Sequence, residues 1–74
     1  MKLQQYWVRY KKNHGRDYGA LEAFASEVGV DARTVRRILH DPNPNITMAM
    51  AFRFFRATHG QVFRVDDFYT EDAQ

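Results

Sequence analysis

The sequence contains no cysteine and little glycine or proline. The absence of cysteine excludes a disulfide framework, a thiolate zinc site and a cysteine nucleophile, and it fits the reducing cytoplasm, where we expect the protein. Four glycines and two prolines exclude a low-complexity linker. No apolar run approaches the roughly 18 residues that cross a bilayer, and the first six residues turn polar too early for a signal peptide. We therefore expect no membrane association.

The chain has 74 residues, of which 45% are hydrophobic, so it has room for one domain with a small core. Its net charge of +2 is unevenly distributed. Residues 1–40 carry eight Lys or Arg and four Asp or Glu, a net charge of +4, whereas residues 41–74 carry three and five, a net charge of −2. A basic first half indicates a polyanionic partner, although a solvated basic surface is an equally ordinary explanation.

Apolar residues that recur every three or four positions predict four helices. These cover residues 2–14, 20–28 and 32–40, and a fourth segment that begins after Asn45 or Thr47 and continues to about His59. Gly19 is expected to cap the start of the second helix, and Gly29 to end it. In the fourth helix, Met48, Ala51, Phe52 and Phe55 are expected to face inward.

The segment from Gln61 to Tyr69 alternates imperfectly between apolar and polar residues. It is compatible with a short strand, with a helix or with an extended docked arm, and local preference does not decide among them. The sequence thus predicts a mainly α, four- to five-helix domain over residues 1–74, with a helix-turn-helix at about 20–40 and a C-terminal arm at 61–74.

The third predicted helix separates apolar from basic side chains. Val35, Ile38 and Leu39 lie on one side, and a basic stripe lies on the other; its members are Arg33, Arg36, Arg37 and His40. No acidic residue between Ala32 and His40 neutralises the stripe. A helix that enters the DNA major groove needs this separation, and arginine can bind guanine O6 and N7 with two hydrogen bonds. A solvated helix face is the simpler alternative.

At this point the chain resembles a known family. Residues 21–38, with Ala25, Gly29, Val30, Val35 and Ile38 at the characteristic positions, look like the helix-turn-helix of lambda-type phage repressors and Cro proteins. The tail, from Ala57-Thr58-His59-Gly60 through Gln61-Val62 to Asp66-Asp67-Phe68-Tyr69, is similar to small Cro-like proteins of the YdaS type.

The resemblance implies a transcriptional regulator of phage or prophage origin, acting in the bacterial cytoplasm on double-stranded operator DNA. It implies base-edge contacts from Asp31, Ala32, Arg33, Arg36 and Arg37, and a phosphate contact at the start of the second helix. Many relatives have glutamine there, whereas this chain has Ala20-Leu21-Glu22, so main-chain N–H groups must replace it. The phosphate contacts considered, from both lines of reasoning, are Lys11, Lys12, Arg16, Tyr18, Ala20, Thr34 and His40.

One short helix reads only three or four base pairs, so we expect a homodimer on a pseudo-palindromic operator, formed either free in solution or only on the DNA. Phe54 lies off the expected inward face of the fourth helix. It is therefore assigned to a two-fold interface formed with Phe63, Val65 and Phe68.

The sequence gives little support for metal binding, cofactor binding or catalysis. His14, His40 and His59 lack metal-ligand spacing, and neither a catalytic triad nor a cofactor motif is present, so we expect no metal, no cofactor and no enzymatic activity. The main alternative to a DNA-binding regulator is a protein-interaction or antitoxin-type module on the same helical scaffold. An RNA binder is a weaker alternative, because no aromatic-rich sheet pattern is present.

Overall fold

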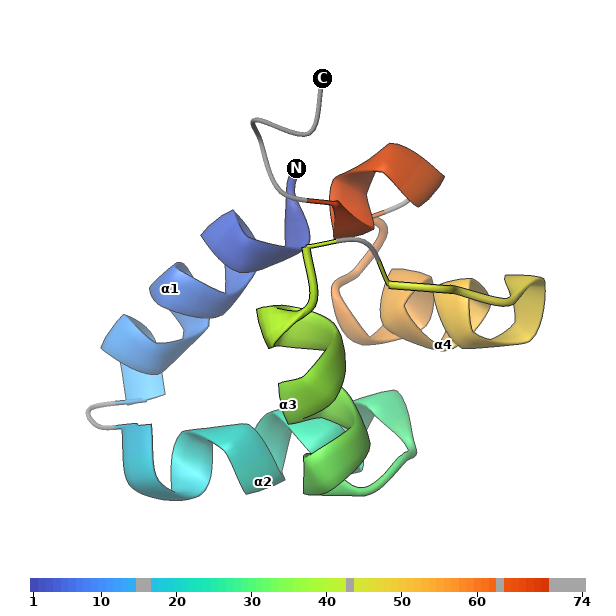
Figure 1. Ribbon diagram of the computed structural model, residues 1–74. Coiled ribbons are helices and arrows are strands. Elements are labelled where there is room, and N and C mark those ends of the chain that lie inside the picture. The colour runs from blue at the N-terminus through green and yellow to red at the C-terminus, as the bar shows by residue number, and fades with distance from the viewer. Residues whose placement is uncertain (15–16, 43, 63, 70–74) are drawn as a thin grey trace.

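The computed structural model describes residues 1–14, 17–42, 44–62 and 64–69, and this part of the chain is mainly helical (Figure 1). Its helices are α1 (Leu3–His14), α2 (Asp17–Val28), α3 (Ala32–His40) and α4 (Met48–Ala57), followed by the 3₁₀ helix η1 (Val65–Phe68). The mainly α fold class is therefore confirmed. The bounds of α1 and α3 lie within one residue of those predicted from apolar spacing.

Side-chain caps define where α3 and α4 begin. The Asp31 carboxylate accepts a hydrogen bond from the main-chain N–H of Thr34 at 3.2 Å, and the Thr47 hydroxyl accepts one from Met50 N–H at 3.1 Å. Both capping residues have extended backbones, which is the usual conformation before the first helical turn. The caps fix α3 at its predicted first residue and select Thr47 over Asn45 for α4.

The turn between α2 and α3 is built on Gly29. This residue has φ +94°, and its N–H donates to the Ala25 carbonyl at 2.8 Å; the N–H of Val30 donates to the same oxygen at 3.2 Å. A left-handed φ is costly for residues with a Cβ, so glycine ends α2 here as predicted. Only three residues separate the two helices, which places the start of α3 close to the end of α2.

The start of α2 differs from the prediction. Gly19 was expected to cap a helix that begins at Ala20, but α2 begins at Asp17 and contains Gly19 as its third residue. Gly19 has φ +87°, outside the right-handed helical region, so the first turn of α2 is irregular at this residue. Apolar spacing did not reveal this first turn, because the buried stripe starts only at Ala20.

The core forms around α2, which contacts α1, α3 and α4. The Phe24 ring is fully buried, with ring centroids of Tyr6 and Trp7 at 5.7 Å and of Phe54 at 6.0 Å. In Figure 1, α1 and α4 lie on opposite sides of α3, with α2 crossing below. This arrangement leaves one long side of α3 away from the core.

The predicted inward face of α4 is wrong for three of its four residues; the fourth, Ala51, is half-buried and packs against the core. Met48, Phe52 and Phe55 are 87%, 57% and 40% exposed, whereas Phe54 and Ala57 are buried. The Phe54 ring packs between Phe24 and Phe68. The prediction failed because α4 is apolar on more than one side, so periodicity alone supports two different faces.

The C-terminal arm packs onto the core and contains no strand within its described residues. Val62 and Phe68 are buried, and the Phe68 ring lies edge-on to Phe54 with centroids 5.2 Å apart. Thr58, also buried, links the arm to α4: its hydroxyl donates to the Phe54 carbonyl at 2.8 Å and accepts from Val62 N–H at 3.1 Å. The docked-arm alternative is therefore the correct one, with η1 at its end.

Candidate nucleic-acid interface

The helix α3 is fixed to the core along one side. Val35, Ile38 and Leu39 are 0%, 2% and 6% exposed. These three positions follow the helical period and come from every turn of a nine-residue helix, so α3 is held along its whole length. A side-chain hydrogen bond reinforces its far end, where the Gln4 amide of α1 donates to the Leu39 carbonyl at 3.2 Å. The orientation of α3 is thus determined by the core.

The opposite side of α3 presents its basic residues to solvent. Arg33, Arg36, Arg37 and His40 are all exposed. Within residues 1–14, 17–42, 44–62 and 64–69, none of the three guanidinium groups forms a salt bridge or a hydrogen bond. Their donors are therefore available to a ligand with paired acceptors, such as a base edge, a phosphate or a carboxylate.

The first turn of α3 is electrostatically organised by its cap. Hydrogen bonds from the side chain and main chain of Thr34 lower the pKa of the Asp31 carboxyl, and nearby Arg33 contributes in the same direction. Asp31 is exposed, and Ala32 and Thr34 are half-buried. All five residues for which base-edge contacts were implied therefore lie at one end or along one side of α3, but Asp31 is already engaged in capping the helix.

The residues proposed for phosphate contacts are less clearly grouped on one surface than the residues with implied base-edge contacts. Lys12 is exposed at the end of α1, while the Lys11 ammonium lies 5.6 Å from the centroid of the Trp7 ring, a cation–π arrangement. Ala20 is completely buried, so a phosphate can approach it only through its main chain. Arg16 lies outside the described residues, as does the side chain of Tyr18.

Two of the four residues assigned to a dimer interface are in the wrong place. Phe54 and Phe68 are 0% and 1% exposed, because they pack against each other and complete the core. Val65 is exposed, and Phe63 lies outside the described residues. A second copy therefore has no access to the Phe54 and Phe68 rings in the folded chain.

Sequence reasoning missed the apolar surface that α4 does expose. Met48, Phe52 and Phe55 follow i, i+4, i+7 and define what we call the α4 stripe. Arg53 and Arg56 are the only charged residues of this helix, but they give no signal that would have found this surface. At 100° per residue, Phe54 and Phe55 lie equally far from the two arginines, so charge placement does not separate the buried face from the α4 stripe.

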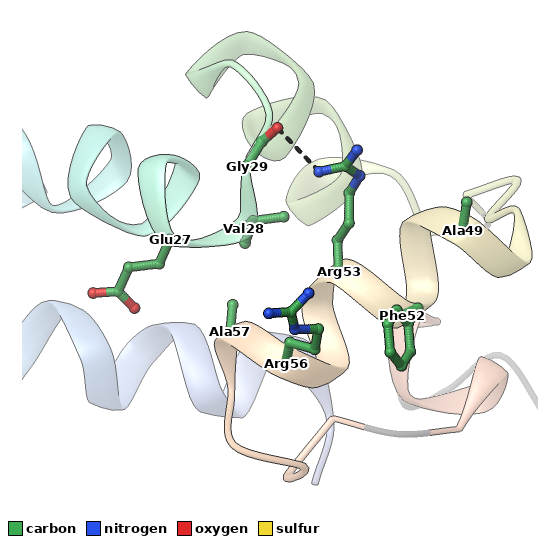
Figure 2. Close-up of a pocket in the computed structure, with 8 residues that line it drawn as sticks. All are labelled: Glu27, Val28, Gly29, Ala49, Phe52, Arg53, Arg56 and Ala57. Atoms are coloured by element: carbon green, nitrogen blue, oxygen red, sulfur yellow. Dashed lines mark hydrogen bonds between the residues drawn. The ribbon is translucent and has the colours of Figure 1, made fainter.

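The α4 stripe borders two hollows. One, of about 660 Å³, is lined by Met48, Ala49, Ala51, Phe52 and Phe55. The other, of about 570 Å³, lies between α4 and the end of α2, and is shown in Figure 2. Phe52 borders both. Neither hollow contains a group of catalytic side chains, although the second has Glu27, Arg53 and Arg56 on its walls.

Two further features concern metals and membranes. No group of three or more His, Asp or Glu side chains able to hold a metal ion occurs among the described residues. In the same part of the chain, every helix is too short or too polar to cross a membrane.

Comparison with protein-family models finds no match, and comparisons with curated proteins and with solved structures find no significant match.

Proposed function

We propose that the protein binds double-stranded DNA in a sequence-specific manner and regulates transcription, with α3 as the helix that enters the major groove. The supporting observation is that Arg33, Arg36 and Arg37 are exposed on a helix whose other side is anchored by three buried residues. None of the three forms a salt bridge or a hydrogen bond with the part of the chain that the structure describes. A basic stripe on a loosely held helix would bind any polyanion. A basic stripe held in one orientation can discriminate between base pairs.

The dimensions of α3 agree with this role. An α-helix with its side chains is about 10–12 Å across, and the major groove is about 12 Å wide. The tight turn at Gly29 places α2 directly beside the start of α3, so that α2 can rest against the sugar–phosphate backbone. Occupying a promoter in this way is sufficient to repress it, and no effector is required.

Selection of bound sequences from random duplex DNA tests the proposal directly. A half-site should emerge, and binding to it should weaken with salt at a log–log slope of about −0.9 for each phosphate neutralised. Arg36→Ala and Arg37→Ala should each reduce discrimination against wrong bases by about 1–3 kcal/mol, because each removes a bidentate contact. Lys12→Ala should weaken all sequences alike.

The matched control is Arg9→Ala, which removes an exposed guanidinium from α1 and should leave discrimination unchanged. If no sequence is enriched, or if the triple variant lacking Arg33, Arg36 and Arg37 retains its sequence preference, α3 is not a recognition helix. The protein-interaction module then becomes the better interpretation.

A further inference from the structure

We infer that Asp31 binds a cytosine in the DNA half-site and that the arginines of α3 bind guanines, so that G·C pairs specify the positions contacted by these side chains. The inference deepens the proposed function and rests on it, because it names the bases that the same surface recognises. It follows from the hydrogen-bonding capacity that the exposed side of α3 presents, beginning with the carboxylate at its first turn.

The Asp31 carboxylate keeps accepting capacity beyond its role as a cap. The main-chain N–H of Thr34 donates to Oδ1 at 3.2 Å, and the Thr34 side chain contributes a second hydrogen bond. An ionised carboxylate has about four lone-pair sites, so the cap leaves about half of them open. Asp31 is exposed, and it forms no salt bridge with the residues that the structure describes. Its remaining lone pairs are therefore available to a ligand.

The cap also fixes the position and the charge of this carboxylate. Hydrogen bonds to Thr34 hold the side chain against the first turn of α3, and they lower the pKa of Asp31, so the group is ionised at neutral pH. An ionised carboxylate accepts hydrogen bonds and donates none. A base that meets Asp31 must therefore offer a donor.

Few base edges in the major groove offer a donor. The amino groups at N4 of cytosine and at N6 of adenine are the two that do, whereas guanine and thymine present the acceptors O6, N7 and O4. Adenine presents its acceptor N7 beside the amino group, so a carboxylate there also meets a lone pair. Cytosine presents no acceptor of its own on this edge. It is therefore the base that suits Asp31, and the other three bases are disfavoured.

The other exposed side chains of α3 are basic. The guanidinium groups of Arg33, Arg36 and Arg37 donate hydrogen bonds and accept none, which suits the two acceptors O6 and N7 of guanine. Asparagine and glutamine, the side chains that bind adenine with two hydrogen bonds, are absent from the nine residues of α3. The exposed side of this helix thus combines one fixed acceptor with three donors, a set that matches cytosine and guanine.

Two substitutions at Asp31 remove the carboxylate and keep a helix cap. Asparagine and serine cap helices about as well as aspartate, so α3 should keep its start. Asp31→Asn replaces one acceptor with a donor and creates a side chain that suits adenine. The matched control is Asp66→Asn, which removes one exposed negative charge from η1, near the end of α3 that is far from Asp31 (Figure 1).

The first measurement is selection of bound half-sites from random duplex DNA by the wild type and by each variant. The wild type should select guanines and one cytosine that depends on residue 31. Asp31→Asn should exchange that cytosine for adenine, Asp31→Ser should leave the position unspecified, and Asp66→Asn should select the wild-type half-site. All other positions should stay the same, because the cap still orients α3.

The second measurement compares affinities for the selected half-site and for duplexes in which the critical cytosine is replaced. Each replacement should weaken binding of the wild type roughly tenfold, as expected for one charge-assisted contact to a base. It should weaken binding of Asp31→Ser less than about twofold. Because the wild type itself shows the first effect, the inference is tested even if a variant folds poorly.

A half-site without a cytosine, or a cytosine preference that survives in Asp31→Ser, overturns the inference. So does selection of A·T pairs at the positions that lose their specificity when Arg33, Arg36 and Arg37 are replaced by alanine. In both cases a half-site still exists, and the proposed function stands. Absence of any half-site for the wild type contradicts the proposed function instead.

Discussion

Substitution of Gly29 by alanine tests the turn that positions α3. At φ +94°, an alanine is in the left-handed region, which costs roughly 1–2 kcal/mol for a residue with a Cβ. The new Cβ would also lie 2.8 Å from Arg53 Nη1. That atom is the end of a flexible, exposed side chain held by one long hydrogen bond, so it can move away at little cost. The backbone should therefore account for most of the destabilisation.

We expect Gly29→Ala to reduce the free energy of unfolding by about 1–2 kcal/mol. In a domain of this size each kcal/mol lowers Tm by about 4–8 °C. Urea titration and thermal unfolding followed by circular dichroism measure both quantities. Gly29→Asn is the matched comparison, because asparagine adopts the left-handed region more readily than alanine, and it should cost less.

Arg53→Ala separates the two contributions to that cost. If backbone strain dominates, Gly29→Ala should be equally destabilising in the wild type and in Arg53→Ala. If the cost of Gly29→Ala falls below about 0.5 kcal/mol, the left-handed turn is not what constrains this position. If the cost disappears only when Arg53 is removed, the steric contact is responsible and the reasoning from φ is refuted.

Two further predictions concern the hydroxyl groups of Thr58 and Tyr10. Thr58→Val keeps the shape of the side chain but leaves the buried N–H of Val62 without its acceptor, which should cost about 1–3 kcal/mol in urea unfolding; Thr58→Ser keeps the acceptor and should retain that bond. Burial, followed by the negative charge of Glu27, raises the pKa of Tyr10 from 10.0 to about 12. Because the folded-state pKa is the higher one, stability should be lost as pH rises from about 10 towards 12, and Tyr10→Phe should remove a tyrosine with a pKa of about 12 from the absorbance titration.

A specific result would contradict each of the predictions for Thr58 and Tyr10. A Thr58→Val protein as stable as the wild type would mean that Val62 N–H finds another acceptor when the arm shifts. A tyrosine titration unchanged by Tyr10→Phe would assign the high pKa to a different ring, and the hydrogen bond of 3.2 Å between Tyr10 and Glu27 would then lack the expected electrostatic effect.

Local sequence was sufficient to predict α3 and its two sides. Asp31 caps the helix through a hydrogen bond three residues away, and Gly29 supplies a backbone conformation that other residues avoid. Val35 and Ile38 alternate with arginines at the helical period, so a single inward side is possible. These determinants act within a few residues, and a sequence displays them directly.

Which face of α4 is buried depends on contacts between residues that are far apart in the chain. Two apolar stripes satisfy the helical period in this segment, and both are compatible with burial. The choice is made by Phe24 and Phe68, whose rings enclose Phe54 from α2 and from the C-terminal arm. Docking of that arm is itself a tertiary event, because its local preferences favour neither strand nor helix.

By itself, therefore, the sequence determined the bounds of α1 and α3 to within one residue, how α3 is capped and which of its side chains are basic and exposed, since these features follow from short-range hydrogen bonding and periodicity. Only the tertiary structure decided which aromatic rings of α4 enter the core and which remain outside. That decision rests on the shape and volume available between α2 and the C-terminal arm, and it buries Phe54 and Phe68 while Met48, Phe52 and Phe55 stay exposed.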